Sequence, residues 1–292
     1  MKTNLLGQSQ LQLESTLERL GEPTFRGRQL FRWIYHRRER DPLRMTDLGQ
    51  ELRERLAKEF TVELPEILER SQSVDGTEKL LLSCDDHTRI ETVLIPDRRT
   101  TTACISSQAG CPLACRFCAT GTLQLQRNLT AGEIVAQALL LRELRGDDAF
   151  SNIVFMGMGE PLLNFDELLV ALEILTSENG LNIAPRRITV STSGITPKIE
   201  RLAQRAPRVN LALSLHAASQ SKREQIMPVA QTFALDKLIA AVKRYAQETR
   251  RRVTFEYILL DSFNDTPEDV RDLARLAQDV NCKINLIAYN PV

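Results

Sequence analysis

The sequence carries no net charge and no apolar stretch that would cross a membrane. Lys plus Arg and Asp plus Glu both number 38, so the total charge neither favours nor excludes a nucleic acid partner. No segment approaches the roughly 18 apolar residues of a membrane span, and the N-terminus lacks the apolar core of a signal peptide. Low-complexity stretches and internal repeats are also missing. We therefore expect a cytoplasmic protein without membrane association, made of one large and one small domain.

Hydrophobic spacing divides the chain into three regions. Leucines three or four residues apart predict helices in residues 1–60, and short alternating patterns predict strands in a connector at 61–97. The remaining region, 98–292, alternates strand and helix patterns. Its strands are expected at 152–157, 187–192, 209–215, 252–260 and 284–289. This repeated order predicts an α/β fold with a parallel sheet curled into a full or partial barrel.

Arginine is concentrated in one part of the helical region. Seven arginines and only two acidic residues lie between Arg26 and Arg44, interleaved with Phe31, Trp33 and Tyr35. These arginines are typical either of the solvated face of a small helical bundle or of a surface that contacts RNA phosphates. The sequence leaves both interpretations open.

Three of the six cysteines fall within eight residues, in the segment GCPLACRFCATG. Cys111, Cys115 and Cys118 have the spacing C-x3-C-x2-C, with Phe117 before the last of them. Thiolates are the usual ligands of iron–sulfur clusters, and three of them leave one iron of a 4Fe–4S cluster open. That iron can take the amino and carboxylate groups of S-adenosylmethionine (SAM), whose one-electron cleavage gives a 5′-deoxyadenosyl radical. We therefore predict a SAM-cleaving cluster.

Two other interpretations of the three cysteines are weaker. A structural zinc site needs a fourth thiolate or imidazole, and none of the candidates His87, His216 and Cys104 has a typical ligand spacing. Buried thiols that act only as small hydrophobic side chains are not expected in a group of three beside Gly110 and Pro112.

Polar and glycine-rich motifs follow the predicted strands. MGMGEP, STSG and SLH each end one strand, and Asn290 follows the last. Ligand sites of barrels form at these strand ends. The Glu160 carboxylate suits the SAM ammonium group, and the Ser191 hydroxyl suits its adenosyl or carboxylate group. Each motif alone is weak evidence, since a serine at a strand end is more often a helix cap, but together they predict a SAM pocket.

The segments CISSQAGCPLACRFCATG, MGMGEPLLN, ITVSTSG, ALSLHA and KINLIAYNP resemble the RlmN/Cfr family of radical SAM RNA adenine methyltransferases, most closely its RlmN branch. The resemblance implies a radical-SAM partial (β/α)6-type barrel, with a small N-terminal helical domain and a short β-strand extension. It implies a 4Fe–4S cluster and SAM as cofactors, and methylation of C2 of an adenosine in 23S ribosomal RNA and in certain tRNAs through a methyl-cysteine. It further implies a monomer served by an electron donor such as flavodoxin or ferredoxin.

The resemblance also assigns residues. Cys111, Cys115 and Cys118 match the cluster ligands, Glu91 matches a proton acceptor, and Cys104 matches a resolving cysteine. The positions that match SAM contacts are Gly159, Glu160, Ser191, Ser214, Leu215, His216 and Asn290. Without the resemblance, Glu91 reads as the polar face of a strand and Cys104 as a core thiol.

One family feature has no match. The methyl-carrying cysteine of the family follows the last barrel strand, whereas no cysteine follows Cys282 here, and neither Cys282 nor Cys84 matches it. We expect the sequence to be part of a longer chain, whose missing segment would leave a sheet edge or part of the core exposed.

Three alternative functions follow from these observations. The first is C8 methylation, as in Cfr. The second is a catalytically incomplete RNA-binding homologue, and the third is a radical SAM enzyme for a small molecule. The third leaves the arginine-rich segment, Glu91 and Cys104 unexplained.

Overall fold

The computed structural model describes residues 2–97 and 100–290, which form two compact units. Unit 1 comprises Met1–Ser106, Leu129–Ile153 and Asp166–Ala184, and unit 2 comprises Ser107–Asn128, Val154–Phe165 and Pro185–Val292. The expected boundary at residue 98 and the last two residues of the expected core lie outside the described residues. No helix among the described residues is long and apolar enough to cross a bilayer.

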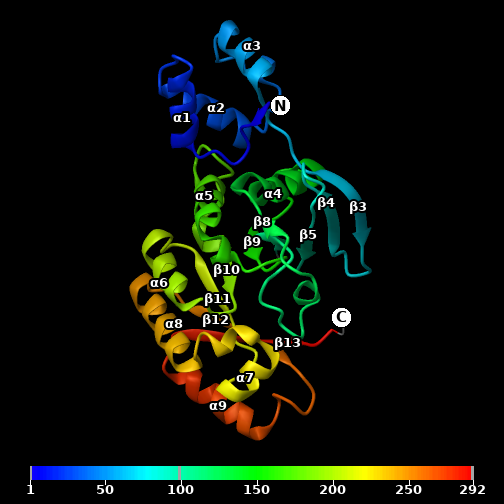
Figure 1. Ribbon diagram of the computed structural model, residues 1–292, viewed down its shortest axis with the longest axis vertical. Helices are drawn as coiled ribbons and strands as arrows, with labels where there is room; N and C mark the ends of the chain where they lie inside the picture. The colour runs from blue at the N-terminus through cyan, green and yellow to red at the C-terminus, as the bar shows by residue number, and fades with distance from the viewer. Residues whose placement is uncertain (1, 98–99, 291–292) are drawn as a thin grey trace. The chain divides into compact units, whose positions relative to one another are not determined.

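Unit 1 begins with the helices that the leucine spacing predicts (Figure 1). The capping box of Ser9 and Gln12 starts the first helix, and Leu13, Leu17, Leu30 and Ile34 are buried on the inner faces. A short parallel pair of strands, β1 and β2, flanks the helices. The elements are β1 (Thr3–Asn4), α1 (Gln10–Arg19), α2 (Phe25–Tyr35), η1 (Pro42–Arg44), α3 (Gln50–Glu59) and β2 (Phe60–Thr61).

Unit 1 continues with four antiparallel strands in the order β3 to β6. Side chains of β5 alternate between buried and accessible, as its sequence pattern predicts. The strand Glu66–Gln72 is exposed at almost every position. It was not predicted, because its sequence lacks an alternation of apolar and polar residues. The strands are β3 (Glu66–Gln72), β4 (Glu78–Ser83), β5 (Arg89–Pro96) and β6 (Thr101–Cys104).

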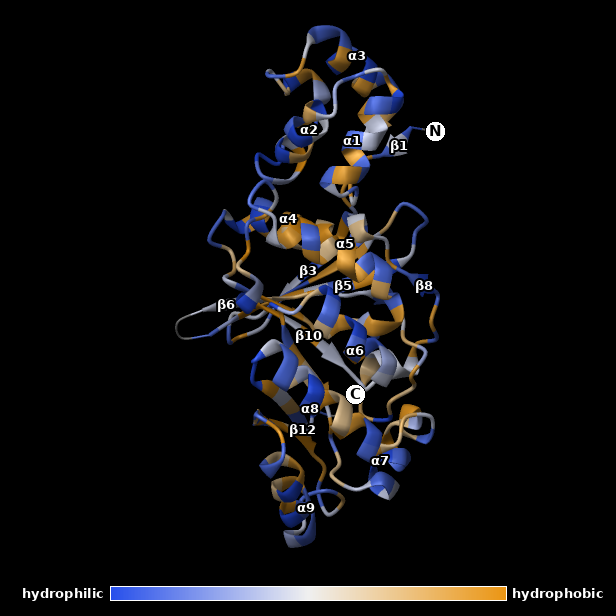
Figure 2. Ribbon diagram, turned by 90° about the vertical axis from the view of Figure 1, so that its left-hand side faces the viewer, coloured by the Kyte–Doolittle hydropathy of each residue, from blue (hydrophilic) through white to orange (hydrophobic). Residues whose placement is uncertain are grey.

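Two helices with a short strand between them form the next part of the chain, up to residue 176. The predicted capping box of Thr130 and Glu133 starts α4 (Ala131–Arg145). Most residues of α4 are buried, and the helix is largely hydrophobic in Figure 2. It is followed by β9 (Asn152–Phe155) and α5 (Phe165–Thr176), close to where the sequence places them.

Unit 2 is built on four parallel strands in the order β10, β11, β12 and β13. Their bounds are Ile188–Thr192, Asn210–Ser214, Val253–Leu259 and Cys282–Ala288. The connecting helices are α6 (Thr196–Arg205), α7 (Gln220–Ile226), α8 (Leu235–Thr249) and α9 (Pro267–Gln278). Because the strands are parallel, the loops that carry STSG and SLH leave the sheet at the same edge.

The burial of the strands changes sharply at the end of unit 2. Six of the seven residues of β12 are buried, whereas most residues of β13 are exposed, including the apolar Ile284 and Leu286. The last strand thus leaves apolar side chains exposed to solvent.

Candidate SAM and cluster site

The three cysteines lie in a loop that a short strand pair closes. The loop runs between β7 (Gln108–Ala109) and β8 (Arg127–Asn128), which pair antiparallel, and contains η2 (Ala119–Thr122). The Gln108 side-chain amide donates to Asn128 Oδ1 at 2.7 Å, which fixes the two ends. Gly121 lets the loop fold tightly, since a Cβ there would collide with the backbone of Cys115. Cys111, Cys115 and Cys118 thereby line one pocket.

The three thiols influence one another. Burial raises the pKa of Cys111 to about 11 and that of Cys115 to about 12. For Cys115, the charges of Cys111 and Cys118 add to the rise. A cationic centre is therefore needed to hold Cys111 and Cys115 as thiolates.

The chemistry of these thiols suits an iron–sulfur cluster, since cysteine thiolates are its usual ligands. In a 4Fe–4S cluster each thiolate binds a different iron, so three separate thiols around a shared cavity are the arrangement expected.

The pocket is a cavity of about 260 Å³ within unit 2, near the lower end of small-molecule pockets. Besides the cysteines, five of the predicted SAM-contacting residues line it: Gly159, Glu160, Ser191, Ser214 and His216. Leu215 is fully buried and Asn290 is exposed; neither is among the lining residues. Residues from four segments far apart in the sequence therefore meet at one cavity.

Glu160 is a buried carboxylate whose direction is fixed by the backbone. It accepts hydrogen bonds from the N–H groups of Leu162 at 3.1 Å and Ser193 at 2.7 Å. Its own N–H donates to Gln108 Oε1 at 2.8 Å. Burial raises the pKa of Glu160, and these hydrogen bonds oppose the rise. A carboxylate held in this way is prepared to accept from a cationic ligand in the pocket.

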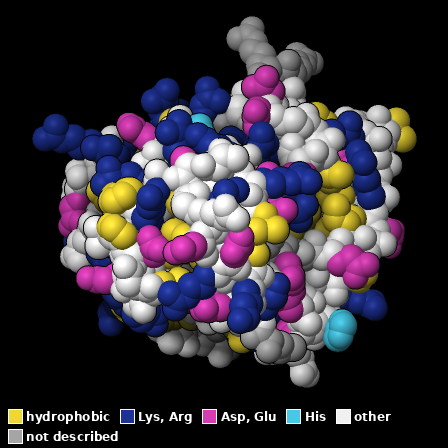
Figure 3. All heavy atoms as spheres, turned by 90° about the horizontal axis from the view of Figure 1, so that it is seen from above, with side chains coloured by type: hydrophobic (Ala, Val, Ile, Leu, Met, Phe, Trp, Pro, Cys, Tyr) yellow, Lys and Arg dark blue, Asp and Glu magenta, His cyan; other side chains and the backbone are white. Residues whose placement is uncertain are grey.

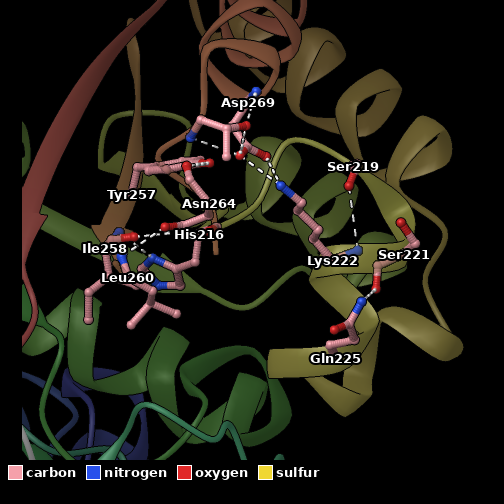
Figure 4. Close-up of polar contacts among 11 residues, drawn as sticks. His216, Ser219, Ser221, Lys222, Gln225, Tyr257, Ile258, Leu260, Asn264 and Asp269 are labelled. Atoms are coloured by element: carbon pink, nitrogen blue, oxygen red, sulfur yellow. Dashed lines mark hydrogen bonds and ion pairs between the residues drawn. The ribbon is translucent and has the colours of Figure 1, made fainter. Parts of the chain in front are cut away.

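His216 is held in one orientation by a backbone group of β12 (Figure 4). Its Nδ1 accepts from the N–H of Ile258 at 3.1 Å, so Nε2 carries the hydrogen of the neutral ring. Burial, followed by the charge of Arg223, lowers the pKa of His216 to about 3, which keeps the ring neutral at physiological pH. The edge of the ring packs against Phe117, with ring centroids 4.5 Å apart. His216 therefore presents one uncharged hydrogen-bond donor, its Nε2–H group.

The two serines occupy neighbouring strands of the sheet. Ser191 is the next-to-last residue of β10 and Ser214 is the last residue of β11, and their Oγ atoms lie 3.4 Å apart. Two adjacent hydroxyl groups can donate to a carboxylate or a ribose as well as accept from it.

Comparison with known proteins identifies the family. Residues 105–277 match the family model described as Radical SAM superfamily, and residues 3–62 match that described as Ribosomal RNA large subunit methyltransferase N-terminal domain. A probable dual-specificity RNA methyltransferase RlmN of Moorella thermoacetica is 48% identical over 301 residues, covering 100% of this chain and 84% of the relative. The chain belongs to the RlmN family of radical SAM enzymes.

Other relatives agree with this membership. The dual-specificity RNA methyltransferase RlmN of Syntrophobacter fumaroxidans is 44% identical over 281 residues, which cover 96% of this chain and 82% of the relative. The crystal structure of a radical SAM methyltransferase from Sphaerobacter thermophilus has a TM-score of 0.92 at 43% identity, covering 99% of this chain and 86% of that chain. The predicted radical SAM fold is thus confirmed. The cofactors of the RlmN family are a 4Fe–4S cluster and SAM.

Two residues that the RlmN resemblance assigns to catalysis lie on neighbouring strands of unit 1. Cys104 pairs with Val93 across β5 and β6, two residues along from Glu91, so the register places Glu91 and Cys104 on the same face of the sheet. Cys104 is buried, whereas the Glu91 carboxylate is accessible and forms an ion pair of 2.9 Å with Lys79. Their catalytic roles stay predictions.

Three supporting residues of this RlmN-family pocket were missed from the sequence. Gln108 holds the N–H of Glu160, Asn264 joins the loops around His216, and Arg223 lies buried behind the pocket wall. The Asn264 amide donates to the carbonyl oxygens of His216 and Ile258, each at 2.7 Å (Figure 4). Each acts on residues distant in the sequence, so no local spacing could have revealed it.

Proposed function

We propose that this protein is a radical SAM RNA methyltransferase that methylates C2 of an adenosine in 23S ribosomal RNA, with tRNA as a second substrate. The observation that carries the proposal is the pocket in which the three cysteine thiols and five of the seven predicted SAM contacts meet. The relatives named dual-specificity RNA methyltransferase RlmN support RNA as the substrate and C2, rather than the C8 of Cfr, as the target atom.

The pocket residues bind and orient SAM. Cys111, Cys115 and Cys118 would hold the cluster, which supplies one-electron cleavage of SAM when bound. The buried Glu160 carboxylate accepts hydrogen bonds from the SAM ammonium group. Gly159 has a φ of +95°, which glycine adopts without strain. Because glycine has no Cβ, a ligand can approach the backbone closely there. The neutral imidazole of His216, the two serine hydroxyls, Leu215 and Asn290 complete the proposed SAM contacts.

Two residues of unit 1 are proposed to take part in the reaction of the RNA. An adenine C2 is a poor nucleophile, so the proposed methylation proceeds by radical addition, and a proton must then leave the base carbon. Glu91 is proposed to accept this proton, since its carboxylate is accessible to solvent. Cys104 is proposed to release the methylated RNA: its thiolate would attack the sulfur of the methyl-carrying cysteine, which has no match in this sequence, so that a disulfide forms, the carbon–sulfur bond breaks and the released carbon takes up a proton.

The proposal includes partners of the reaction. Flavodoxin or ferredoxin is proposed as the electron donor, and the enzyme is proposed to act as a monomer in the cytoplasm. A sequence with six cysteines, three of them predicted cluster ligands, suits such a reducing compartment. The target adenosine must leave its stack to reach the reacting groups.

The reaction can be tested in two steps. Anaerobically reconstituted protein with SAM and a reductant is expected to release 5′-deoxyadenosine, and Cys115→Ala is expected to abolish it. Cys282→Ala is the matched control, because Cys282 does not line the pocket. Absence of 5′-deoxyadenosine from the reconstituted wild-type protein would favour a catalytically incomplete RNA-binding homologue.

The target atom requires a separate measurement. Mass spectrometry of nucleosides from 23S ribosomal RNA is expected to show that deletion of the gene removes 2-methyladenosine. Loss of 8-methyladenosine instead would assign the protein to the Cfr reaction.

A further inference from the structure

Arg223 is a fully buried arginine that forms hydrogen bonds to backbone carbonyl groups beside the pocket. It lies on α7 with an exposed fraction of 0%. Its Nη2 donates to the carbonyl oxygen of Ser193 at 2.6 Å, and its Nε donates to that of Leu215 at 3.3 Å. Both carbonyl groups belong to loops that follow β10 and β11, the strands that carry Ser191 and Ser214. The guanidinium group therefore joins two loops of the predicted SAM site.

One donor of this guanidinium group has no partner. Nη1 of Arg223 is buried and makes no hydrogen bond within the described part of the chain. An unpaired buried donor costs on the order of 1–3 kcal/mol, and more when it is charged. The partners that Arg223 does have are neutral carbonyl groups, so its charge is not balanced by a carboxylate within hydrogen-bonding distance. An anionic ligand would satisfy the unpaired Nη1 donor and balance the guanidinium charge.

The nearby group that would be anionic with a cluster bound is a thiol of the cluster loop. The N–H of Arg116, next to Cys115, donates to the carbonyl oxygen of Ile226, three residues after Arg223, so the cluster loop and α7 adjoin. The electrostatic influence between the two side chains agrees with this: burial lowers the pKa of Arg223 to about 10, the charge of Cys115 acts against this lowering, and Arg223 opposes the larger rise that burial causes in the pKa of Cys115.

The helix that carries Arg223 is fixed on two sides. The N–H of Arg116, next to Cys115, donates to the carbonyl oxygen of Ile226 at 2.9 Å and ties the cluster loop to the end of α7. Lys222 forms hydrogen bonds of 2.7 Å to both oxygens of Asp269, at the start of α9 (Figure 4). Arg223 is thus held in place independently of any ligand.

We propose that Arg223 is the buried counter-cation of the cluster: its Nη1 donates a hydrogen bond to the sulfur atoms at Cys115 and raises the reduction potential of the cluster. The inference rests on the proposed cluster site and adds a residue that positions and tunes it. Three thiolates make the bound cluster anionic, and reduction adds a further negative charge. A fixed cation stabilises the reduced form more than the oxidised form, and both net charge and hydrogen bonds to sulfur set cluster potentials.

The test is a midpoint potential, measured by an anaerobic redox titration of the reconstituted protein followed by electron paramagnetic resonance. Arg223→Gln is expected to shift the ratio of reduced to oxidised cluster at least tenfold toward the oxidised form. For a one-electron couple this is about 59 mV toward more negative potential. Signals are normalised to iron and sulfide content, so a lower cluster yield does not affect the value.

Two further variants separate tuning from a purely structural role. Arg142→Gln is the matched control: Arg142 is also a partly buried arginine that donates to a backbone carbonyl, at 3.0 Å, but it lies in unit 1. It is expected to leave the potential unchanged. Arg223→Lys keeps the charge but not the forked hydrogen bonds, and is expected to recover at least half of the shift. An unchanged potential in Arg223→Gln, or a lysine variant as shifted as the glutamine variant, would overturn the inference.

A structure of the reconstituted wild-type protein decides the matter if Arg223→Gln holds no cluster. We expect Nη1 of Arg223 within hydrogen-bonding distance of Cys115 Sγ or of a cluster sulfide. A water molecule or an empty space between them would overturn the inference. Wild-type protein that binds no iron and sulfide would instead contradict the proposed function itself, so the two failures are distinguishable.

Discussion

At the scale of single residues, the pocket combines one buried carboxyl group with several neutral polar ones. Glu160 is buried and oriented by two backbone N–H groups, while His216 is neutral and held through Nδ1. His216 also has a φ of +55°, a conformation that costs a non-glycine residue on the order of 1–3 kcal/mol. The hydrogen bond from Asn264 to its carbonyl oxygen helps to hold this strained backbone. A rigid site of this kind is expected to select one orientation of a cationic ligand.

Replacement of Glu160 tests the proposed SAM ammonium contact. Glu160→Gln keeps the shape and an acceptor oxygen but removes the charge. A hydrogen bond to a charged group contributes about 1.5–3 kcal/mol, so SAM is expected to bind roughly 10- to 100-fold more weakly. Calorimetric titration of reconstituted protein with SAM measures this.

The exposed Glu248 of α8 provides the matched control for this substitution. Glu248→Gln is expected to leave SAM affinity unchanged. Equal affinity of Glu160→Gln and wild-type protein would exclude the carboxylate as a SAM ligand.

The sequence and its family resemblance predicted eight of the residues that line the pocket. Glu160, Ser191 and His216 lie at or shortly after the ends of apolar strands, and parallel strands bring such positions to one edge. The residues that orient them were not found: Gln108 and Asn264 act through hydrogen bonds to backbone groups 52 and 48 residues away. A contact of that kind depends on the tertiary fold and leaves no local pattern.

At the scale of elements, α7 shows where sequence patterns fail. The helix has seven residues, QSKREQI, of which only Arg223 and Ile226 are buried. The helix is too short to show a hydrophobic period, so its sequence predicts a polar loop. Its start is fixed by the Ser219 side chain, which accepts from the N–H of Lys222. Longer elements such as α4 and β12 were predicted because their apolar residues repeat over several turns or strand positions.

The attachment of α7 to α9 is expected to depend on pH. Burial would raise the pKa of Asp269, but hydrogen bonds from Lys222 and Thr266 outweigh burial and lower it. A carboxylate with a lowered pKa stabilises the fold above its unfolded pKa of about 3.9, and this stabilisation is lost as pH falls toward the folded value. Asp269→Asn removes this titration.

Urea unfolding between pH 5 and pH 2 measures the effect. The wild-type protein is expected to lose more unfolding free energy over this range than Asp269→Asn does. Asp279→Asn, at the other end of α9, is the control and is expected to behave as the wild type. Parallel pH profiles of Asp269→Asn and wild type would show that the Lys222–Asp269 pair does not contribute.

The helix α2 offers the clearest basic surface for RNA among the arginines of residues 26–44. Positive and negative side chains are interspersed in the view of Figure 3. Arg37 stacks on Trp33, and Arg38 and Arg40 form ion pairs with Asp147 and Glu143, so they are partly neutralised within unit 1. The remaining arginines of α2 include two exposed side chains one helical turn apart, Arg28 and Arg32.

Charge reversal of these two arginines tests their role. Arg28→Glu with Arg32→Glu is expected to weaken RNA binding and to reduce the slope of log affinity against log salt by about 2. SAM cleavage without RNA is expected to be unaffected. Arg271→Glu, exposed on α9, is the control. Unchanged RNA affinity of the double variant would indicate that these arginines form only a solvated face.

At the scale of the whole molecule, the alternation of strands and helices after residue 120 was enough to predict the fold class. Parallel strands need long crossovers, and the predicted helices supply them. The exposed strand β3 and the division into two compact units were not predicted. Both depend on packing between segments that are distant in the sequence, whereas each helix and strand of the core carries its own periodic signal.

The most direct test of the central claim is the electron paramagnetic resonance spectrum of the reduced, reconstituted protein with and without SAM. If Cys111, Cys115 and Cys118 leave one iron open, SAM is expected to bind that iron and change the spectrum of a 4Fe–4S cluster. The Glu160→Gln variant should require more SAM for the same change. A spectrum insensitive to SAM, or protein that takes up zinc and no inorganic sulfide, would contradict the assignment of this pocket.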